Sequence, residues 1–242
     1  MSAPTDNPKR NKFPLWRLAD VAIRPPQSAV ERRVSLGKLL LLLLIGGICY
    51  GAVMGSFAWV GGYRSFAEQF PQMICSGLKV PCLLLLTMTL ALPSFFVFNS
   101  LAGLRDDFRY VCWALLRAQT AVALILISFS PITMFLYVSL PNSGEEYPAA
   151  IMFNALIFGV ASVAAQINLS KSYQPLIEKN RAHLWLKRGW ILIYAFVGIQ
   201  LGWNLRPFIG SPNSPFAIFR ETGFENAYIY IWEIALRFVE SI

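Results

Sequence analysis

The sequence predicts an all-α protein, a polytopic transmembrane helical bundle of five spans. Of its 242 residues, 56% are hydrophobic and 14% are charged, whereas soluble domains carry about 25% charged residues. The mean hydropathy is +0.51. The apolar residues gather in five long runs, and most positive charges lie in alternate loops between the runs. This composition excludes a soluble globule, a disordered chain and a disulfide-stapled domain.

Each apolar run is long enough to cross a hydrocarbon core about 30 Å thick. Pro93 and Pro131 lie inside the second and third runs and predict kinks, because proline cannot donate the helical hydrogen bond. Trp185, Trp190 and Trp203 bracket the fifth run as interfacial anchors. The predicted spans are 38–60, 73–101, 110–140, 149–169 and 189–205.

Residues 1–37 form a basic N-terminal arm. Prolines bracket a short amphipathic helix within it, with Trp16 on the apolar side and Arg17 on the polar side. We expect this helix to lie on the membrane surface; docking on the protein's own cytoplasmic loops is the alternative. Ser28 and Glu31 form a capping box that predicts the start of the helix entering the first span.

Residues 38–206 make up the five-span bundle, and residues 207–242 follow as an aromatic, proline-rich outer loop and a terminal apolar segment. Segment 227–239 is short and carries Glu233 and Arg237. We therefore predict an interfacial or re-entrant C-terminal helix, with a crossing in partnership with a neighbouring helix as the alternative.

Positive charges give the predicted orientation. Lys and Arg gather ahead of the first span, between the second and third, and between the fourth and fifth, while the other loops hold few. The positive-inside rule then places the N terminus in the cytoplasm and, with five spans, the C terminus outside. Because the net charge of +8 lies mostly in these loops, we expect no nucleic-acid partner.

Small residues predict helix-packing faces on the first and fourth spans. Gly47, Gly51 and Gly55 form a GxxxGxxxG ladder on one face, which lets another backbone approach closely. Ala155 and Gly159 belong to a small-residue face of the fourth span. The pattern leaves open whether the partner of the ladder is another span or a second protein.

Polar residues inside the spans predict a polar pocket near the outer face of the bundle, because each is costly in lipid and should point inward. Lys79 either extends to the headgroups or points inward toward polar groups at the same depth. The candidate pocket residues are Lys79, Asn99, Gln119, Asn154, Gln200 and Asn204.

The stretch from Gln200 to Tyr228 combines prolines, which keep the chain extended, with phenylalanines, which give it an apolar side. We expect it to lie on the outer surface of the bundle as a lid or docking platform; an ordered loop that only seals the helix ends is the alternative. The candidate docking residues are Arg206, Phe208, Phe216, Phe219 and Arg220.

Signatures of enzymes are missing from the sequence, which contains no HExxH, GxSxG, Walker A or GxGxxG motif. We therefore expect no enzymatic activity, no metal and no cofactor. His183, the single histidine, is expected to lie in a loop near lipid headgroups. Four cysteines without CxxC spacing, Cys49, Cys75, Cys82 and Cys112, are interpreted as small hydrophobic residues.

The run GWNLRPFIGSPNSPFAIFRE, together with PSFFVFNSLAG in the second span and YGAVMGSF at the end of the first, resembles a group of uncharacterised bacterial polytopic inner-membrane proteins. The resemblance implies a bacterial inner-membrane location and a helical fold, without an activity. The five-span layout with a cytoplasmic N-terminal arm is also similar to the Yip family of membrane proteins.

Together these features predict a non-enzymatic scaffold or accessory subunit of a membrane complex. Its expected partners are the lipid bilayer and other membrane proteins or a second copy of the chain. A small transporter or lipid-handling protein with a polar pocket near the outer face is the alternative. An intramembrane enzyme is disfavoured, since no pair of nucleophile and base is found at a known spacing.

Overall fold

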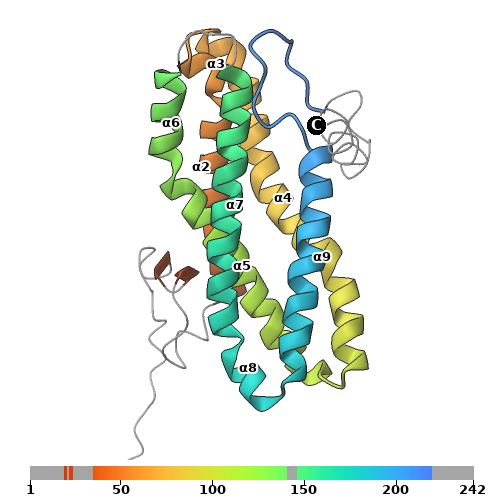
Figure 1. The fold of residues 1–242 in the computed structure, drawn as a ribbon. Helices are drawn as coiled ribbons and strands as arrows, with labels where there is room; N and C mark the ends of the chain where they lie inside the picture. The colour runs from red at the N-terminus through yellow and green to blue at the C-terminus, as the bar shows by residue number, and fades with distance from the viewer. Residues whose placement is uncertain (1–18, 21, 24–34, 141–145, 220–242) are drawn as a thin grey trace, which may run out of the picture.

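The computed structural model describes residues 19–20, 22–23, 35–140 and 146–219, and its long elements are helices (Figure 1). Five of these helical stretches are long and apolar enough to cross a membrane, which confirms the predicted fold class. The elements are α2 (Leu36–Gly55), α3 (Phe57–Val60), α4 (Phe66–Leu101), η2 (Arg105–Asp107), α5 (Phe108–Ser128), α6 (Ser130–Ser139), α7 (Glu146–Ser172), α8 (Gln174–Lys179) and α9 (Ala182–Asn204).

Helix α4 begins seven residues before the predicted second span, because a capping box starts it at Ser65. The Ser65 hydroxyl accepts from the Glu68 amide at 3.4 Å, and a Glu68 carboxylate oxygen accepts from the Ser65 amide at 3.0 Å. The helix then continues through Pro71, Pro81 and Pro93.

The predicted third span is divided at Phe129 into α5 and α6. Pro131 lies in the first turn of α6, where its missing amide donor does not interrupt a hydrogen-bonded helix interior. The break therefore lies where the sequence predicts a kink.

Helix α2 lies between α4 and α5, and glycines bring it close to both. A Cβ on Gly46 would lie 2.9 Å from the carbonyl oxygen of Ala123 in α5. A Cβ on Gly47 would lie 3.0 Å from the Pro81 ring, and one on Gly51 would contact the carbonyl oxygen of Ser76. The glycine ladder thus packs within the chain, against α4.

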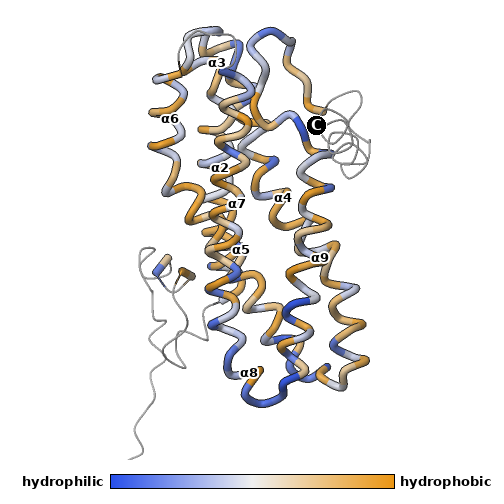
Figure 2. The backbone as a smooth tube through the Cα atoms, viewed as in Figure 1, coloured by the Kyte–Doolittle hydropathy of each residue, from blue (hydrophilic) through white to orange (hydrophobic). Residues whose placement is uncertain are grey.

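Two outer helices complete the bundle around α2, α4 and α5: α7 packs on α5, and α9 packs on α4. We call the two ends of the bundle the α3 end and the α8 end, after the short helices that mark them (Figure 1). Hydrophilic residues gather around α8, while the middle parts of the long helices are mainly hydrophobic (Figure 2).

Part of the N-terminal arm contacts the bundle. Ala22 is fully buried, and its carbonyl oxygen accepts a hydrogen bond from the Asn168 side-chain amide of α7 at 3.0 Å. This contact favours docking on the protein itself over a position on the membrane surface. The predicted capping box at Ser28 and Glu31 and the predicted C-terminal helix at 227–239 lie outside the described residues.

Replacing Gly51 by alanine should lower the melting temperature of the purified protein in mild detergent. The new Cβ would lie 2.8 Å from the Cα of Gly77, so α2 and α4 would have to move apart. Overpacking of this kind costs about 1–3 kcal/mol. Differential scanning fluorimetry would measure the change.

The matched control is Gly159→Ala, because a Cβ at Gly159 meets no atom of a neighbouring element within 4 Å. Equal melting temperatures for the Gly51→Ala protein and the wild type would contradict the close packing of α2 on α4.

Candidate functional site

Asn154, one of the predicted pocket residues, lies at the centre of a buried hydrogen-bonded cluster. Its side-chain oxygen accepts from the Tyr50 hydroxyl at 2.9 Å, and its nitrogen donates to the Tyr137 hydroxyl at 2.8 Å and to the Ala150 carbonyl oxygen at 2.8 Å. Tyr137 in turn donates to the carbonyl oxygen of Met54 at 3.3 Å. These contacts tie α2, α6 and α7 together.

The other predicted amides make separate contacts. Gln119 accepts from the Tyr194 hydroxyl at 2.7 Å and links α5 to α9. Asn99 donates to the carbonyl oxygen of Phe95 in its own helix, α4. Gln200 donates to Asn204 at 3.2 Å within α9. These hydrogen bonds of the four amides therefore do not join one cluster with Lys79 or Asn154, and among them the one between Tyr194 and Gln119 links two helices.

Lys79 is buried, with 5% of its surface exposed, and it points toward the loop that follows α9. Its ammonium donates to the carbonyl oxygen of Pro207 at 2.8 Å and to that of Ile218. The same ammonium lies 5.1 Å from the centre of the Phe219 ring and 5.9 Å from that of Phe208, within range of cation–π attraction. Lys79 thus holds the loop on the α3 end.

Further side chains fix the same loop through its backbone. Gln72 donates to the Phe208 carbonyl oxygen at 3.2 Å, and Tyr147 donates to that of Ile209 at 3.1 Å. Arg64 donates to the carbonyl oxygen of Pro212 at 3.1 Å. These donors are not predictable from the sequence, because nothing in their spacing relates them to a loop so far along the chain.

The predicted docking residues divide into two groups. The Arg206 guanidinium lies over the Trp203 ring, 3.1 Å from its centre, and Phe208 is half-buried and lines a groove between α7 and α9. Phe216 and Phe219 are 42% and 52% exposed. Arg220 lies outside the described residues.

An apolar groove of about 890 Å³ runs between α7 and α9. Residues 151–170 of α7 and 191–202 of α9 form its walls, and Leu83, Leu84 and Thr87 of α4 form its floor. The loop residues Pro207, Phe208 and Ile209 line it at the α3 end. Its volume lies within the range of about 300–1,000 Å³ that is typical of ligand pockets.

Small residues keep this groove open. Ala155 and Gly159, predicted to form a helix-packing face, are exposed and line the α7 wall. Gly198 and Gly202 line the α9 wall opposite. Neither Gly159 nor Gly202 has an atom of a neighbouring element within 4 Å of its Cβ position, so the space in front of both is unfilled by the described chain.

At the α8 end the groove meets a second, polar pocket of about 670 Å³. Ile167 and Ser170 line both spaces, so the two adjoin along α7. Lys171, Arg181 and Lys187 supply positive charges around the second pocket. We call this second space the basic pocket. In the sequence these cations indicate only the orientation in the membrane, because it is the fold around α8 that brings them together.

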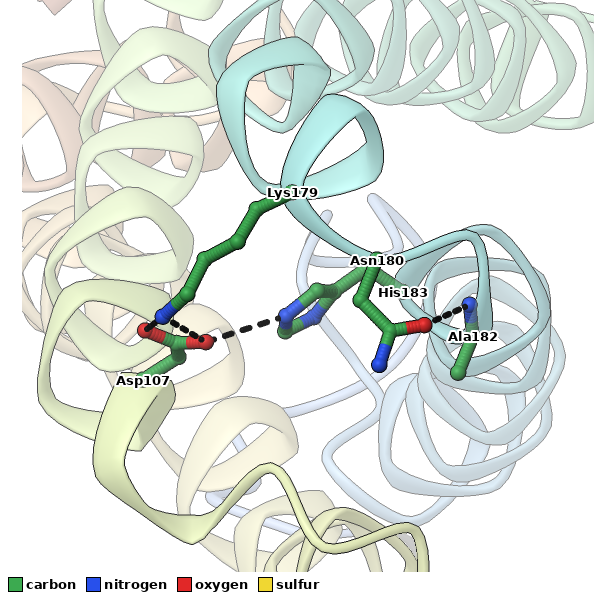
Figure 3. Close-up of polar contacts among 5 residues, drawn as sticks. All are labelled: Asp107, Lys179, Asn180, Ala182 and His183. Carbon is green, nitrogen blue, oxygen red and sulfur yellow. Dashed lines mark hydrogen bonds and ion pairs between the residues drawn. The ribbon is translucent and has the colours of Figure 1, made fainter.

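A polar clamp holds the turn between α8 and α9 that carries part of the basic pocket (Figure 3). Both carboxylate oxygens of Asp107, in η2, accept from the Lys179 ammonium at 2.8 and 3.0 Å. His183 lies 3.3 Å from the same carboxylate, and Asn180 accepts from the Ala182 amide at 2.9 Å. The clamp fixes η2 to the α8–α9 turn.

His183 differs from its prediction as a loop residue near headgroups. It lies in the first turn of α9 and is fully buried, because that turn packs against Asp107. Across the described ranges, no three His, Cys, Asp or Glu side chains gather closely enough to hold a metal ion, and the four cysteines are free thiols.

Comparison of the chain with known protein families, with curated proteins and with solved structures found no match.

Replacing Lys79 by methionine should expose the loop at 206–219 to proteolysis and lower the melting temperature. The change removes the donor for two loop carbonyl oxygens, and a hydrogen bond to a charged group contributes about 1.5–3 kcal/mol. Limited digestion with chymotrypsin, read by mass spectrometry, would report cleavage at the loop phenylalanines.

Lys171→Met is the control, since this lysine lies at the opposite end of the bundle. Unchanged cleavage in the Lys79→Met protein would show that the ammonium does not hold the loop.

Proposed function

We propose that this chain is a non-enzymatic integral membrane protein that binds membrane lipid in the groove between α7 and α9. The observation that carries the proposal is an apolar cavity of about 890 Å³ whose walls are two candidate membrane-spanning helices. Such a cavity opens onto acyl chains rather than onto water, and acyl chains match its lining.

The length of the groove supports this occupant. From Ile151 to Ser170 the α7 wall extends about 28 Å at 1.5 Å per residue, close to the thickness of about 30 Å of a hydrocarbon core. Thr87, Ser162 and Tyr194 are among the few polar residues in a mainly apolar lining, which is typical of small-molecule sites. The groove therefore runs through about the full depth of the core, and an acyl chain from one leaflet, about half that depth, can lie along part of α7.

A second candidate function is a scaffold that receives the transmembrane helix of another protein in the same groove. The open space in front of Gly159 and Gly202 favours it, because small residues let a partner backbone approach. The glycine ladder of α2 gives this candidate no support, since α4 already covers it.

The proposed location is the bacterial inner membrane, with the N terminus and the α8 end in the cytoplasm. Lys and Arg are concentrated in the segments at that end, in accord with the positive-inside rule. The sequence resemblance to bacterial inner-membrane proteins points to the same membrane.

Filling the groove tests the proposal. Wild-type protein released from phosphatidylcholine nanodiscs should retain bound lipid in native mass spectrometry, and the double variant Gly159→Leu, Gly202→Leu should retain less. Both positions have room for a side chain, so we expect the variant to fold. Gly189→Leu is the matched control, because Gly189 is equally open and lies outside the groove lining.

Absence of retained lipid in the wild type, or equal retention in the double variant, would contradict lipid binding in the groove. A stoichiometric membrane partner that co-purifies with the wild type, and that the double variant loses, would establish the scaffold instead.

A further inference from the structure

The basic pocket and the groove adjoin each other at Ile167 and Ser170 and differ in chemistry. The groove is apolar along most of its length, and the pocket at its α8 end carries the charged side chains Lys171, Arg181, Lys187 and Glu178. Three cations against one carboxylate leave an excess of positive charge at the place where the apolar lining ends.

Two of these cations are available to a ligand. In the described part of the chain, neither Lys171 nor Arg181 has a hydrogen-bonded acidic partner, and both side chains are exposed. Lys187 is half-buried and donates to the Ser170 hydroxyl at 3.2 Å. That contact holds its ammonium directly at the junction between the pocket and the groove.

A buried acceptor lies at the same junction. The side-chain oxygen of Gln166 is buried and has no hydrogen-bond partner among the described residues. Gln166 lines the groove one turn before Ser170. Leaving such a group unsatisfied is costly, so a ligand that brings a hydroxyl donor to this level gains from it.

We propose that this composite space binds an anionic phospholipid, with its phosphate in the basic pocket and its acyl chains in the groove. The inference rests on the proposed lipid binding and adds the class of lipid and its direction. Arginine and lysine are suited to phosphate oxygens, and basic pockets between membrane helices on the cytoplasmic side bind anionic headgroups.

The arrangement of the two spaces also indicates where along α7 the lipid headgroup would lie. Ser170 marks the level at which the groove becomes the basic pocket, so a phosphate beside Lys187 leaves the acyl chains directed toward the α3 end. A glycerol headgroup at that level would bring hydroxyl donors near Gln166. Phosphatidylglycerol has both the charge and the hydroxyl groups that this site would recognise.

Competition between two lipids of equal chain composition tests the inference. The protein is reconstituted in nanodiscs with equal amounts of phosphatidylglycerol and phosphatidylcholine, and the lipids retained after release are identified by native mass spectrometry. We expect the wild type to retain phosphatidylglycerol preferentially, and the variant Lys171→Gln, Arg181→Gln, Lys187→Gln to lose that preference by about fivefold or more. The triple variant should still retain lipid through its intact groove.

The control variant Arg105→Gln, Arg109→Gln, Arg188→Gln removes three cations from the same end of the chain without touching either space. It should keep the wild-type preference. If it loses the preference equally, the effect belongs to the general charge of that end, and the assignment to the basic pocket is overturned.

Two further outcomes separate the proposals. Lipid retained by the wild type without preference for phosphatidylglycerol would overturn the headgroup site and leave groove binding intact, whereas no retained lipid would overturn both. Inorganic phosphate alone is the last probe. If it stabilises the wild type and the groove-filled Gly159→Leu, Gly202→Leu protein equally, and neither protein retains phosphatidylglycerol preferentially, the site takes free phosphate rather than lipid.

Discussion

Helices in a bilayer gain little from burying apolar side chains against one another, so they associate through close backbone packing and hydrogen bonds. In this protein the close packing begins at α2. Gly47 and Gly51 admit α4, and Gly46 on the adjacent side admits α5. With α4 and α5 held on two sides of α2, α9 packs on α4 and α7 on α5. The two outer helices are thereby held apart over α4, and the groove between them follows from the position of α2.

The sequence predicts the helical class and the five apolar spans because both depend on composition and run length, and the chain satisfies them locally. The glycine ladder is visible in the sequence, but its partner is not, since a GxxxG face accepts any closely approaching helix. The candidate site could not be predicted from the sequence for a related reason. Ala155 and Gly159 suggest contact with another helix, whereas the fold leaves them beside open space. In the sequence, Lys171 and Arg181 indicate only a positively charged segment between two spans. In the structure, the turn of the chain at α8 places both around one pocket.

The polar residues of the spans divide between support and recognition. Asn154, Gln119 and Lys79 are engaged with other parts of the chain, and their contacts fix α6, α7, α9 and the loop after α9 relative to the centre. Gln166 and Lys187 lie instead where the groove meets the basic pocket. The first group connects the helices and the loop to one another, and the second lies at the end of the cavity where the positive charges gather. Lipid binding accounts for this division more directly than a scaffold built on the ladder.

The loop after α9 is attached to the bundle in an unusual way. Arg64, Gln72, Ser76, Lys79 and Tyr147 all donate to main-chain carbonyl oxygens between Pro207 and Ile218. Every residue type carries such an oxygen, so these hydrogen bonds do not depend on the identity of the loop side chains. Exposed positions such as Phe216 can therefore be substituted while these backbone hydrogen bonds remain. Substitutions at these loop positions can therefore change the surface chemistry of the α3 end without changes in the helices below it.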